Sequence, residues 1–392
     1  MNKNYAVLLI YMLSSNGSVI YGQNDYWNTQ RKGGNCFNDT LSEEWFIDAK
    51  DLGLEWVRLA YDKWESKERD FLVGNASDYK GLVKKDLNKL KEAVEWADKY
   101  NIQLVISPLS LPGSRYRQNN GNKPDSRLWK DFSYQDQAIR FWVDLARELK
   151  DYDHVTYNLI NEPFPELGAG VEEHYSPGEV SKFLEWYQSV KDTPRDIYKF
   201  YSKIIKEIRK VDPDKMIMLD AGWYGQPGAF CYWPSAFEDQ NILYSFHMYE
   251  PYEFTSNKNF KEKNNYVYPG LVPFGKDTIY WDKNTTELYF QPFLKWVEEN
   301  DIPINRIVCG EFGCMRKNEG AAKYLQDIIN FLNQYGFHWA FYSYREDAWD
   351  GYDYELGTEA LGWKYWEAKE KGENPALPRK NNNLFEVIKQ QF

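Results

Sequence analysis

Two glutamates in this sequence stand where carboxyl groups can act as a catalytic pair. Glu162 follows the apolar run at 155–161, and Glu311 follows the run at 307–310. Each therefore lies at the C-terminal end of a predicted buried strand, where an unpaired charge is costly. Cleavage of a glycosidic bond needs two carboxyl groups, because one protonates the leaving oxygen and the other attacks the anomeric carbon or activates water. The alternative for each residue is a loop carboxylate paired with a nearby basic side chain.

Apolar strand-like runs alternate with helical patterns from about residue 33 to the end of the chain. This alternation is typical of βα units around a parallel sheet, and the nearly continuous Val, Ile, Leu and Tyr runs are typical of strands buried on both faces. No internal repeat or linker divides the chain. We therefore predict an α/β fold, a single (β/α)8 TIM barrel over residues 23–392. Its eight predicted strands cover residues 33–37, 56–60, 103–107, 155–160, 216–220, 243–247, 307–310 and 339–343.

Helical spacing of apolar residues predicts the outer layer of this barrel. Such residues recur every three to four positions over 87–97, 138–145 and 197–211. Ser133 and Asp136 resemble a capping box at the start of the second of these helices. The pair Asp212-Pro213 ends the third.

Four connections that follow predicted strands are much longer than the usual βα loop. In a barrel these loops open on the face at the C-terminal ends of the strands, where active sites of this fold lie. They carry tryptophans that either stack on a substrate or fill the loops as structural plugs. The loops cover about 108–132, 163–194, 248–285 and 344–380, and the tryptophans are Trp129, Trp281, Trp349, Trp363 and Trp366.

From residue 33 to about residue 344 the chain resembles glycoside hydrolase family 5, the cellulase family of the clan-A barrel hydrolases. Asn161-Glu162-Pro163 is similar to the acid/base motif of that family, and Glu311 in the segment CGEFG is similar to its nucleophile motif. Arg58 matches the arginine at the end of the second strand. His247-Met248-Tyr249 matches the His-x-Tyr after the sixth strand. Five matching features in the same order make the resemblance specific.

The resemblance implies a retaining glycosidase that works in two steps and needs no metal or organic cofactor. Glu162 is then the acid/base and Glu311 the nucleophile, so that their carboxyl groups should lie about 5 Å apart rather than about 6.5–9.5 Å. Asn161 can hydrogen-bond the sugar 2-hydroxyl as the transition state forms. Arg58 can favour the charged form of Glu311.

His247 and Tyr249, from the motif after the sixth strand, can support the same two-step reaction. Tyr249 can donate a hydrogen bond to Glu311, and His247 can bind a sugar hydroxyl or a catalytic carboxylate. The residues alone leave other interpretations open. Arg58 can belong to a structural ion pair, and His247 can be a satisfied core histidine.

Two positions depart from the family pattern. Leu109 stands where the family has a histidine, and Tyr342 stands where a tryptophan usually forms the sugar platform. Both positions normally shape the subsite beside the carboxyl pair, so the departures concern the substrate more than the chemistry. Trp223 and Trp349 are the candidates for a replacement ring.

Composition limits the partners and the location of the protein. A net charge of -11 argues against nucleic acids and anionic membranes, whereas 18% aromatic residues suits a neutral sugar polymer. An apolar stretch near the start predicts a signal peptide over residues 1–22, and hence a secreted, periplasmic or cell-surface protein. We expect a monomer. The cysteines show no metal-binding spacing and leave disulfide pairing open; they are Cys36, Cys231, Cys309 and Cys314.

Three functions remain open from the sequence. The leading one is an endo-acting hydrolase of a β-linked polysaccharide or oligosaccharide, of the endo-β-1,4-glucanase or mannanase type. An exo-acting β-glucosidase of the same family is the alternative, and a cleft closed at one end would favour it. From another class, the chain can be a carbohydrate-binding barrel without activity, although binding alone has no use for a paired acid and nucleophile.

Overall fold

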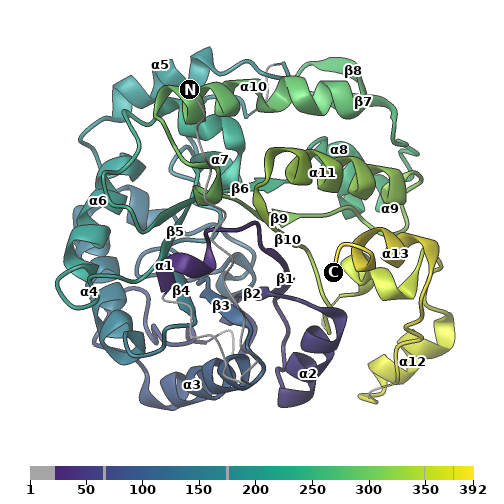
Figure 1. Cartoon of the computed structure of the whole chain (residues 1–392), viewed down its shortest axis with the longest axis horizontal. Coiled ribbons are helices and arrows are strands. Elements are labelled where there is room, and N and C mark those ends of the chain that lie inside the picture. Colours follow the sequence, from purple (N-terminus) through teal and green to yellow (C-terminus); the bar gives the residue numbers. More distant parts are fainter. Residues whose placement is uncertain (1–22, 65–67, 174–175, 348, 374) are drawn as a thin grey trace, which may run out of the picture.

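Eight parallel strands close into a barrel in the computed structural model of this protein, which describes residues 23–64, 68–173, 176–347, 349–373 and 375–392 (Figure 1). Around the barrel the strands follow the order β1-β10-β9-β6-β5-β4-β3-β2. The predicted (β/α)8 fold is therefore confirmed, and each predicted strand forms, with small differences at its ends. The barrel strands are β1 (Lys32–Cys36), β2 (Trp56–Leu59), β3 (Gln103–Ile106), β4 (Val155–Asn158), β5 (Ile217–Asp220), β6 (Ile242–Met248), β9 (Ile307–Phe312) and β10 (His338–Phe341).

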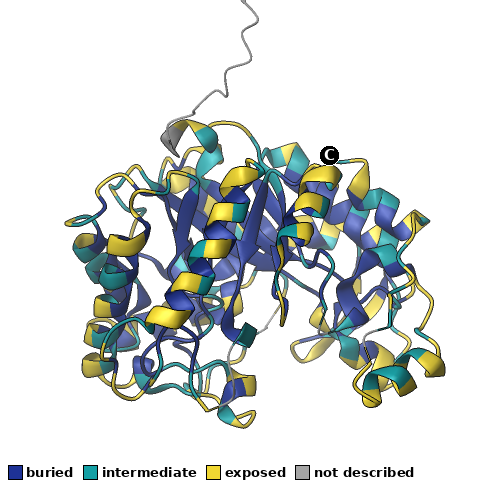
Figure 2. Cartoon of the chain, turned by 90° about the horizontal axis from the view of Figure 1, so that it is seen from below, coloured by how far each residue is buried: buried dark blue, intermediate teal, exposed yellow. Residues whose placement is uncertain are grey.

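Helices surround the barrel and bury it, because their apolar faces pack on the outward side chains of the strands (Figure 2). The connection from β5 to β6 is an exception, since a 3-10 helix over Pro227–Tyr232 takes the place of a full helix. The helices are α1 (Gln23–Tyr26), α2 (Glu43–Leu52), α3 (Lys84–Lys99), α4 (Phe132–Leu149), α5 (Ser181–Val190), α6 (Ile197–Ile208), α7 (Gly222–Gly225), α8 (Tyr252–Thr255), α9 (Asn257–Lys261), α10 (Lys283–Glu299), α11 (Ala321–Tyr335), α12 (Trp363–Glu370) and α13 (Asn383–Lys389).

The start of α4 differs from the sequence prediction. The carboxylate of Asp131 accepts a hydrogen bond from the backbone N–H of Ser133, so Asp131 is the N-cap and Ser133 lies inside the helix. The predicted capping box at Ser133 and Asp136 is therefore wrong. Asp131 is itself a strong capping residue, and it satisfies one of the free N–H groups of the first turn.

The base of the barrel is plugged by tryptophans. Trp27, which follows α1, packs edge-on against Trp56 with the ring centroids 5.5 Å apart, and against His338 at 5.0 Å. Gly33 allows this packing, because a Cβ at that position would lie 2.4 Å from the carbonyl oxygen of Trp56. Aromatic side chains thus fill the inside of the barrel at its base.

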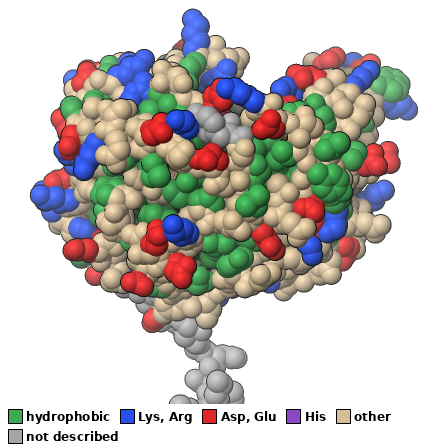
Figure 3. Space-filling model, turned by 90° about the horizontal axis from the view of Figure 1, so that it is seen from above, with side chains coloured by type: hydrophobic (Ala, Val, Ile, Leu, Met, Phe, Trp, Pro, Cys, Tyr) green, Lys and Arg blue, Asp and Glu red, His purple; other side chains and the backbone are tan. Residues whose placement is uncertain are grey.

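The long loops at that other end contain regular structure of their own. The segment 163–194 includes α5, and the segment 248–285 includes an antiparallel hairpin of β7 (Gly270–Phe274) and β8 (Asp277–Trp281). Trp129 and Trp281 are buried and act as plugs of these loops. Trp363 and Trp366 on α12 are instead 69% and 44% exposed. Figure 3 views the molecule from the side of α5, α10 and this hairpin, and the acidic and basic side chains on this side are interspersed.

The remaining sequence predictions concern the N-terminal segment and the cysteines. The predicted signal peptide at residues 1–22 lies outside the described residues. All four cysteines are free thiols. Within the described part of the chain, no helix combines the length and the hydropathy that a membrane span requires.

Candidate active site

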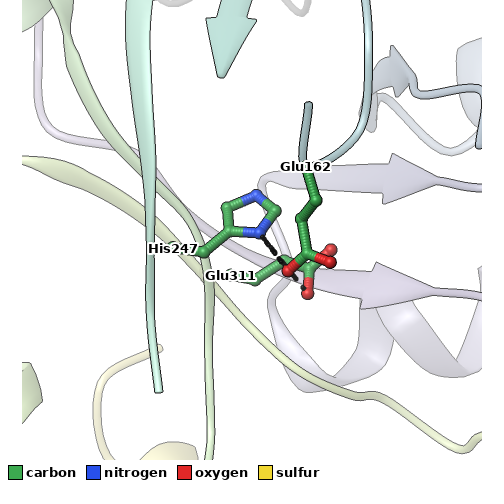
Figure 4. Close-up of side chains that lie close together, drawn as sticks. All are labelled: Glu162, His247 and Glu311. Carbon is green, nitrogen blue, oxygen red and sulfur yellow. Dashed lines mark hydrogen bonds and ion pairs between the residues drawn. The ribbon is translucent and has the colours of Figure 1, made fainter. Parts of the chain in front are cut away.

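The ends of β4, β6 and β9 bring Glu162, His247 and Glu311 together at the mouth of the barrel (Figure 4). His247 Nδ1 lies 2.9 Å from Glu162 Oε1 and 3.8 Å from Glu311 Oε2. One ligand atom from each of the three side chains lies within 4.8 Å of the others. The two carboxyl groups therefore have the close spacing that the sequence analysis anticipated.

A local irregularity between β6 and β9 places Glu311 opposite His247. Phe246 pairs with Cys309, but the next residue, His247, pairs with Glu311, so that one residue of β9 is passed over. That residue is Gly310, where a Cβ would lie 2.6 Å from Ser245 Oγ and 3.2 Å from His247 Nε2. A glycine is required here, because the bulge brings its backbone against the neighbouring strand.

Arg58 at the end of β2 connects the groups around the site. Its guanidinium donates to Glu311 Oε1 at 2.5 Å, to Asn161 Oδ1 at 2.7 Å and to Asp220 Oδ2 at 3.1 Å. Burial alone would lower the pKa of Arg58, but the charges of Asp220 and Glu311 outweigh burial and raise it. The guanidinium is thus a fixed positive charge at the barrel mouth.

Glu311 is held at both carboxylate oxygens. Arg58 binds Oε1, and the hydroxyl of Tyr249 donates to Oε2 at 2.7 Å. The Glu311 side chain is only 11% exposed. Two donors on an almost buried carboxylate fix its direction.

Glu162 has a different environment. Its side chain is 31% exposed towards the cavity, and its carboxylate contacts His247. Burial, followed by the nearby charge of Glu311, raises the pKa of Glu162, while His247 and Arg58 partly oppose that shift. Burial also disfavours the charged form of His247, but Glu311 and Asp220 outweigh it and raise the pKa of His247 to about 10. The site therefore combines a carboxyl with raised pKa and an imidazolium.

Asp220 is a site residue that the sequence analysis did not identify. It is fully buried at the end of β5, with Oδ2 3.1 Å from Arg58 and 3.3 Å from His247 Nε2. Burial opposes its ionisation, but the charges of His247 and Arg58 lower its pKa to about 2. The same rule that singled out Glu162 and Glu311, a carboxylate at a strand end, would have found it.

Asn158 and Asn35 complete the inner layer and were also missed. Asn158 Oδ1 accepts from Arg58 Nη2 at 2.8 Å and from Ser107 Oγ at 2.7 Å. The side-chain amide of Asn35 donates to the carbonyl oxygen of Gly310 at 2.9 Å. Both residues face the barrel interior, where they orient the guanidinium and the bulge.

A cavity of about 420 Å³ opens beside Glu162. Its wall includes His247 and Tyr249 together with the unpredicted residues Arg117, Glu173 and Tyr224. Glu311 is not part of this wall. The cavity therefore lies on the Glu162 side of the carboxyl pair.

The residues at the two departures from the family pattern lie near the site. Tyr342 is half-buried, and the negative charges of Glu346 and Glu311 add to the effect of burial in raising its pKa. Leu109 directs its backbone N–H to the buried carboxylate of Asp62 at 2.8 Å. The backbone N–H of Tyr342 donates to the carbonyl oxygen of Phe312 at 2.8 Å, which places Tyr342 near Glu311, whereas Leu109 is held by its main chain.

Of the two candidates for a replacement ring, Trp223 is buried and Trp349 is half-buried. Trp223 lines the cavity wall but is only 1% exposed, because it packs between Phe183 and Phe164. Trp349 packs edge-on against Tyr352 at 5.1 Å and does not belong to the cavity wall. Trp223 therefore offers no open face to a sugar, whereas a role of Trp349 as the replacement ring stays a prediction.

Glu162, His247 and Glu311 are also the kinds of ligand that can hold a metal ion. Arg58 already places a positive charge 2.5 Å from Glu311, and His247 with its raised pKa places another beside Glu162. A divalent cation would be repelled by both charges. The donor set suits proton transfer and covalent chemistry better than metal binding.

The barrel and the carboxyl pair at its mouth define an O-glycosyl hydrolase. A family model described as cellulase (glycosyl hydrolase family 5) matches residues 21–348, and the chain belongs to this family.

Individual relatives agree with this assignment. The chain is 24% identical over 336 residues to endoglucanase C of Acetivibrio thermocellus. The aligned region covers 79% of this chain and 87% of the relative. It is 23% identical over 290 residues to cellodextrinase A of Ruminococcus flavefaciens, covering 73% of each. Among solved structures, an endoglucanase of Thermotoga maritima superimposes with a TM-score of 0.63 at 18% identity, covering 93% of this chain and 98% of the other.

Proposed function

We propose that this protein is a retaining, endo-acting β-glucan hydrolase of the endo-β-1,4-glucanase type. The observation that carries the proposal is the close carboxyl pair of Glu162 and Glu311, whose nearest ligand atoms lie within 4.8 Å. Retaining enzymes hold the two groups about 5–5.5 Å apart, whereas inverting enzymes leave about 6.5–9.5 Å for a water. The relatives named endoglucanase support the choice of a β-glucan.

The different surroundings of the two carboxyl groups give each a role. Glu162, whose pKa is raised by burial and by Glu311, keeps its proton and delivers it to the leaving oxygen. Glu311, held by Arg58 and Tyr249, attacks the anomeric carbon and forms a covalent glycosyl-enzyme. Glu162, now a carboxylate, then takes a proton from the water that releases the sugar.

The neighbouring residues support these steps. Asn161 is oriented by Arg58, so its amide N–H₂ is free to face the sugar 2-hydroxyl. His247, fixed between Glu162 and Asp220, directs the acid towards the cavity. Tyr342 borders the subsite beside Glu311 in place of an indole, so the sugar accepted there need not be the one most common in the family.

An open cleft favours endo action. The cavity beside Glu162 is next to a second hollow of about 410 Å³, and Glu173, Glu250 and Tyr252 line both. A polymer chain can therefore continue beyond the first leaving-group sugar. An exo-acting β-glucosidase would close the other side of the carboxyl pair, beyond the sugar that Glu311 attacks, so the product spectrum distinguishes the two modes.

Release of reducing sugar from a panel of substrates tests the proposal. The panel contains β-1,4-glucans, mixed-linkage β-glucans, mannans, xylan and aryl β-glycosides, with Glu311→Ala as the control protein. We expect wild-type activity on at least one β-glucan and a spread of oligosaccharide products at early times. Equal rates for wild type and Glu311→Ala on every substrate would support a binding barrel without activity, and release of single glucose units alone would support the exo alternative.

We also propose that the protein is exported and acts as a monomer outside the cytoplasm. The apolar stretch within residues 1–22 supports export, and a polymeric substrate requires it. N-terminal sequencing of protein recovered from the culture medium or the cell envelope tests this, and an intact Met1 would contradict it. Light scattering of the purified protein gives the oligomeric state.

A further inference from the structure

The turn that follows β5 has a backbone conformation that side chains rarely adopt. Trp223 has φ 52° and ψ 49°, and Tyr224 has φ 57° and ψ 35°. Both residues are therefore left-handed, although neither is a glycine. Side chains other than glycine are strained in this conformation, because Cβ approaches the following carbonyl oxygen. Such a conformation persists only where the surroundings enforce it, and it is frequent at functional sites.

A buried carboxyl group holds this turn in place through hydrogen bonds. Glu166 is 2% exposed, and it accepts hydrogen bonds from the backbone N–H of Trp223 at 3.1 Å and from Tyr232 Oη at 2.7 Å. The backbone at Gly222 presses against both groups, because a Cβ there would lie 2.5 Å from Glu166 Oε1 and 2.1 Å from Tyr232 Oη. The loop after β4 thus supplies a fixed acceptor for the turn after β5.

The turn sends its two aromatic side chains in opposite directions. Trp223 points inward and stacks on Phe183 with centroids 4.8 Å apart. Tyr224 points outward, is 43% exposed, and stacks on Phe164 at 4.1 Å. The backbone N–H of Tyr224 also donates to the carbonyl oxygen of Pro163 at 3.2 Å. The exposed phenol ring of Tyr224 is therefore held by contacts with Pro163 and Phe164, the two residues that follow Glu162.

The position of Tyr224 assigns it to one side of the scissile bond. Tyr224 and Glu162 both line the cavity of about 420 Å³, and Glu311 does not. Glu162 protonates the oxygen of the leaving group in the proposed reaction, so the cavity on its side receives the sugar that departs. A flat, exposed ring on the wall of such a cavity suits the apolar face of a sugar ring.

We propose that Tyr224 is the platform on which the leaving-group sugar stacks, and that Glu166 is the positioning residue that holds this platform through the strained turn. The inference rests on the proposed function and deepens it, because it assigns leaving-group specificity to residues outside the carboxyl pair. Glu166 acts through the backbone and makes no contact with the reacting atoms. Tyr224 touches only the departing sugar.

Substrates with and without a leaving-group sugar test the platform. A β-cellobiosyl fluoride places only a fluoride ion on the Glu162 side, whereas cellotetraose places sugar rings there. We expect Tyr224→Ala to lower kcat/KM for cellotetraose by about 10- to 100-fold, the loss expected when one large apolar contact is removed. Its kcat/KM for the fluoride should stay within about twofold of wild type. Tyr280→Ala, which removes another exposed tyrosine on β8 outside the cavity wall, is the matched control and should change neither value.

A pair of substitutions tests the positioning role of Glu166. Burial raises the pKa of Glu166 to about 8, so its neutral form is the one a glutamine imitates. We expect Glu166→Gln to keep both activities near wild type, and Glu166→Ala to repeat the loss seen for Tyr224→Ala on cellotetraose only. Near-ultraviolet circular dichroism and activity on the fluoride show that each variant is folded.

The possible outcomes separate this inference from the function on which it rests. Equal losses on the fluoride and on cellotetraose for Tyr224→Ala would overturn the platform. Glu166→Ala with wild-type activity on cellotetraose would overturn the positioning role. Lack of turnover of both substrates by the wild-type protein would instead refute the proposed function.

Discussion

Two buried histidines at opposite ends of the barrel show how this fold separates structure from chemistry. His247 lies at the mouth, at the end of β6, and His338 lies at the base, at the start of β10. The pKa of His247 is raised to about 10, whereas burial lowers the pKa of His338 to about 4. The same side chain is therefore a cation at one end and neutral at the other.

The difference lies in the partners and not in burial, which is nearly complete for both rings. His338 Nδ1 accepts from the backbone N–H of Arg31 at 2.9 Å, and Nε2 lies 3.1 Å from the carbonyl oxygen of Asn305. His247 faces Glu162, Asp220 and Glu311. His338 is held by neutral backbone groups, whereas the opposed charges around His247 are available for proton transfer.

The largest expected effect is at the mouth. We expect Glu311→Ala to lower kcat by about 10⁴-fold or more, because no other described group is placed to form the covalent intermediate. Steady-state kinetics on the best substrate of the panel measure the loss. Retention of a tenth of the wild-type rate would exclude Glu311 as the nucleophile.

Glu162→Ala should lose less, and the loss should depend on the leaving group. General acid catalysis contributes about 10²- to 10⁴-fold. We expect a loss in that range for oligosaccharides and a much smaller loss for dinitrophenyl glycosides, whose leaving group needs no proton. Equal losses on both substrates would show that Glu162 is not the proton donor.

Replacement of His247 should change how activity depends on pH, which tests whether this histidine is a cation. The positive charge of His247 lowers the pKa of Glu162, so its removal leaves the raising effects of burial and Glu311 unopposed. We expect His247→Asn to reduce activity by about tenfold through lost orientation. We also expect the alkaline limb of kcat/KM to move to higher pH. A shift to lower pH would mean that His247 does not act on Glu162 as a cation.

Replacement of His338 should have the smallest effect on activity and a clear one on stability. His338→Leu leaves the N–H of Arg31 without its acceptor, which costs about 1–3 kcal/mol of unfolding free energy. Activity at a temperature below unfolding should match wild type. Urea denaturation and initial rates check both, and a selective loss of activity would contradict the separation of base and mouth.

The two histidines also predict opposite contributions to stability with pH. The pKa of His338 falls from 6.5 to about 4 on folding, so its contribution is lost as pH falls from 6.5 to about 4. The pKa of His247 rises from 6.5 to about 10, so its contribution is lost as pH rises through that window. His338→Leu should flatten the acid side of the stability profile, and His247→Asn the alkaline side.

Much of this architecture was predictable from the sequence. Strands such as β6 and β9 form long apolar runs, because both faces of a barrel strand are buried. Residues that follow such runs meet at one end of the barrel, which explains why Arg58, Glu162 and Glu311 converge. The family assignment is confirmed, whereas the catalytic roles of these residues remain predictions.

Other features depend on contacts that no local pattern encodes. Asp220 is a carboxylate at a strand end like Glu162 and Glu311, but its contacts with Arg58 and His247, which are distant in sequence, appear only in the structure. The turn after β5 carries glycines at Gly222 and Gly225, but the left-handed backbone of Trp223 and Tyr224 between them depends on Glu166, which lies in another loop. Burial of Trp129 and Trp281 likewise follows from loop packing that composition does not specify.

The stereochemistry of the first product tests the assignment of Glu162 and Glu311 most directly. Proton NMR of a β-glucan oligosaccharide digest follows the anomeric signals of the new reducing end before mutarotation. Double displacement through Glu311 predicts that the β-anomer accumulates first, and that Glu311→Ala supplied with azide forms the α-glycosyl azide. Initial accumulation of the α-anomer by the wild-type protein would contradict the account, because it would mean a single displacement by water and no covalent bond to Glu311.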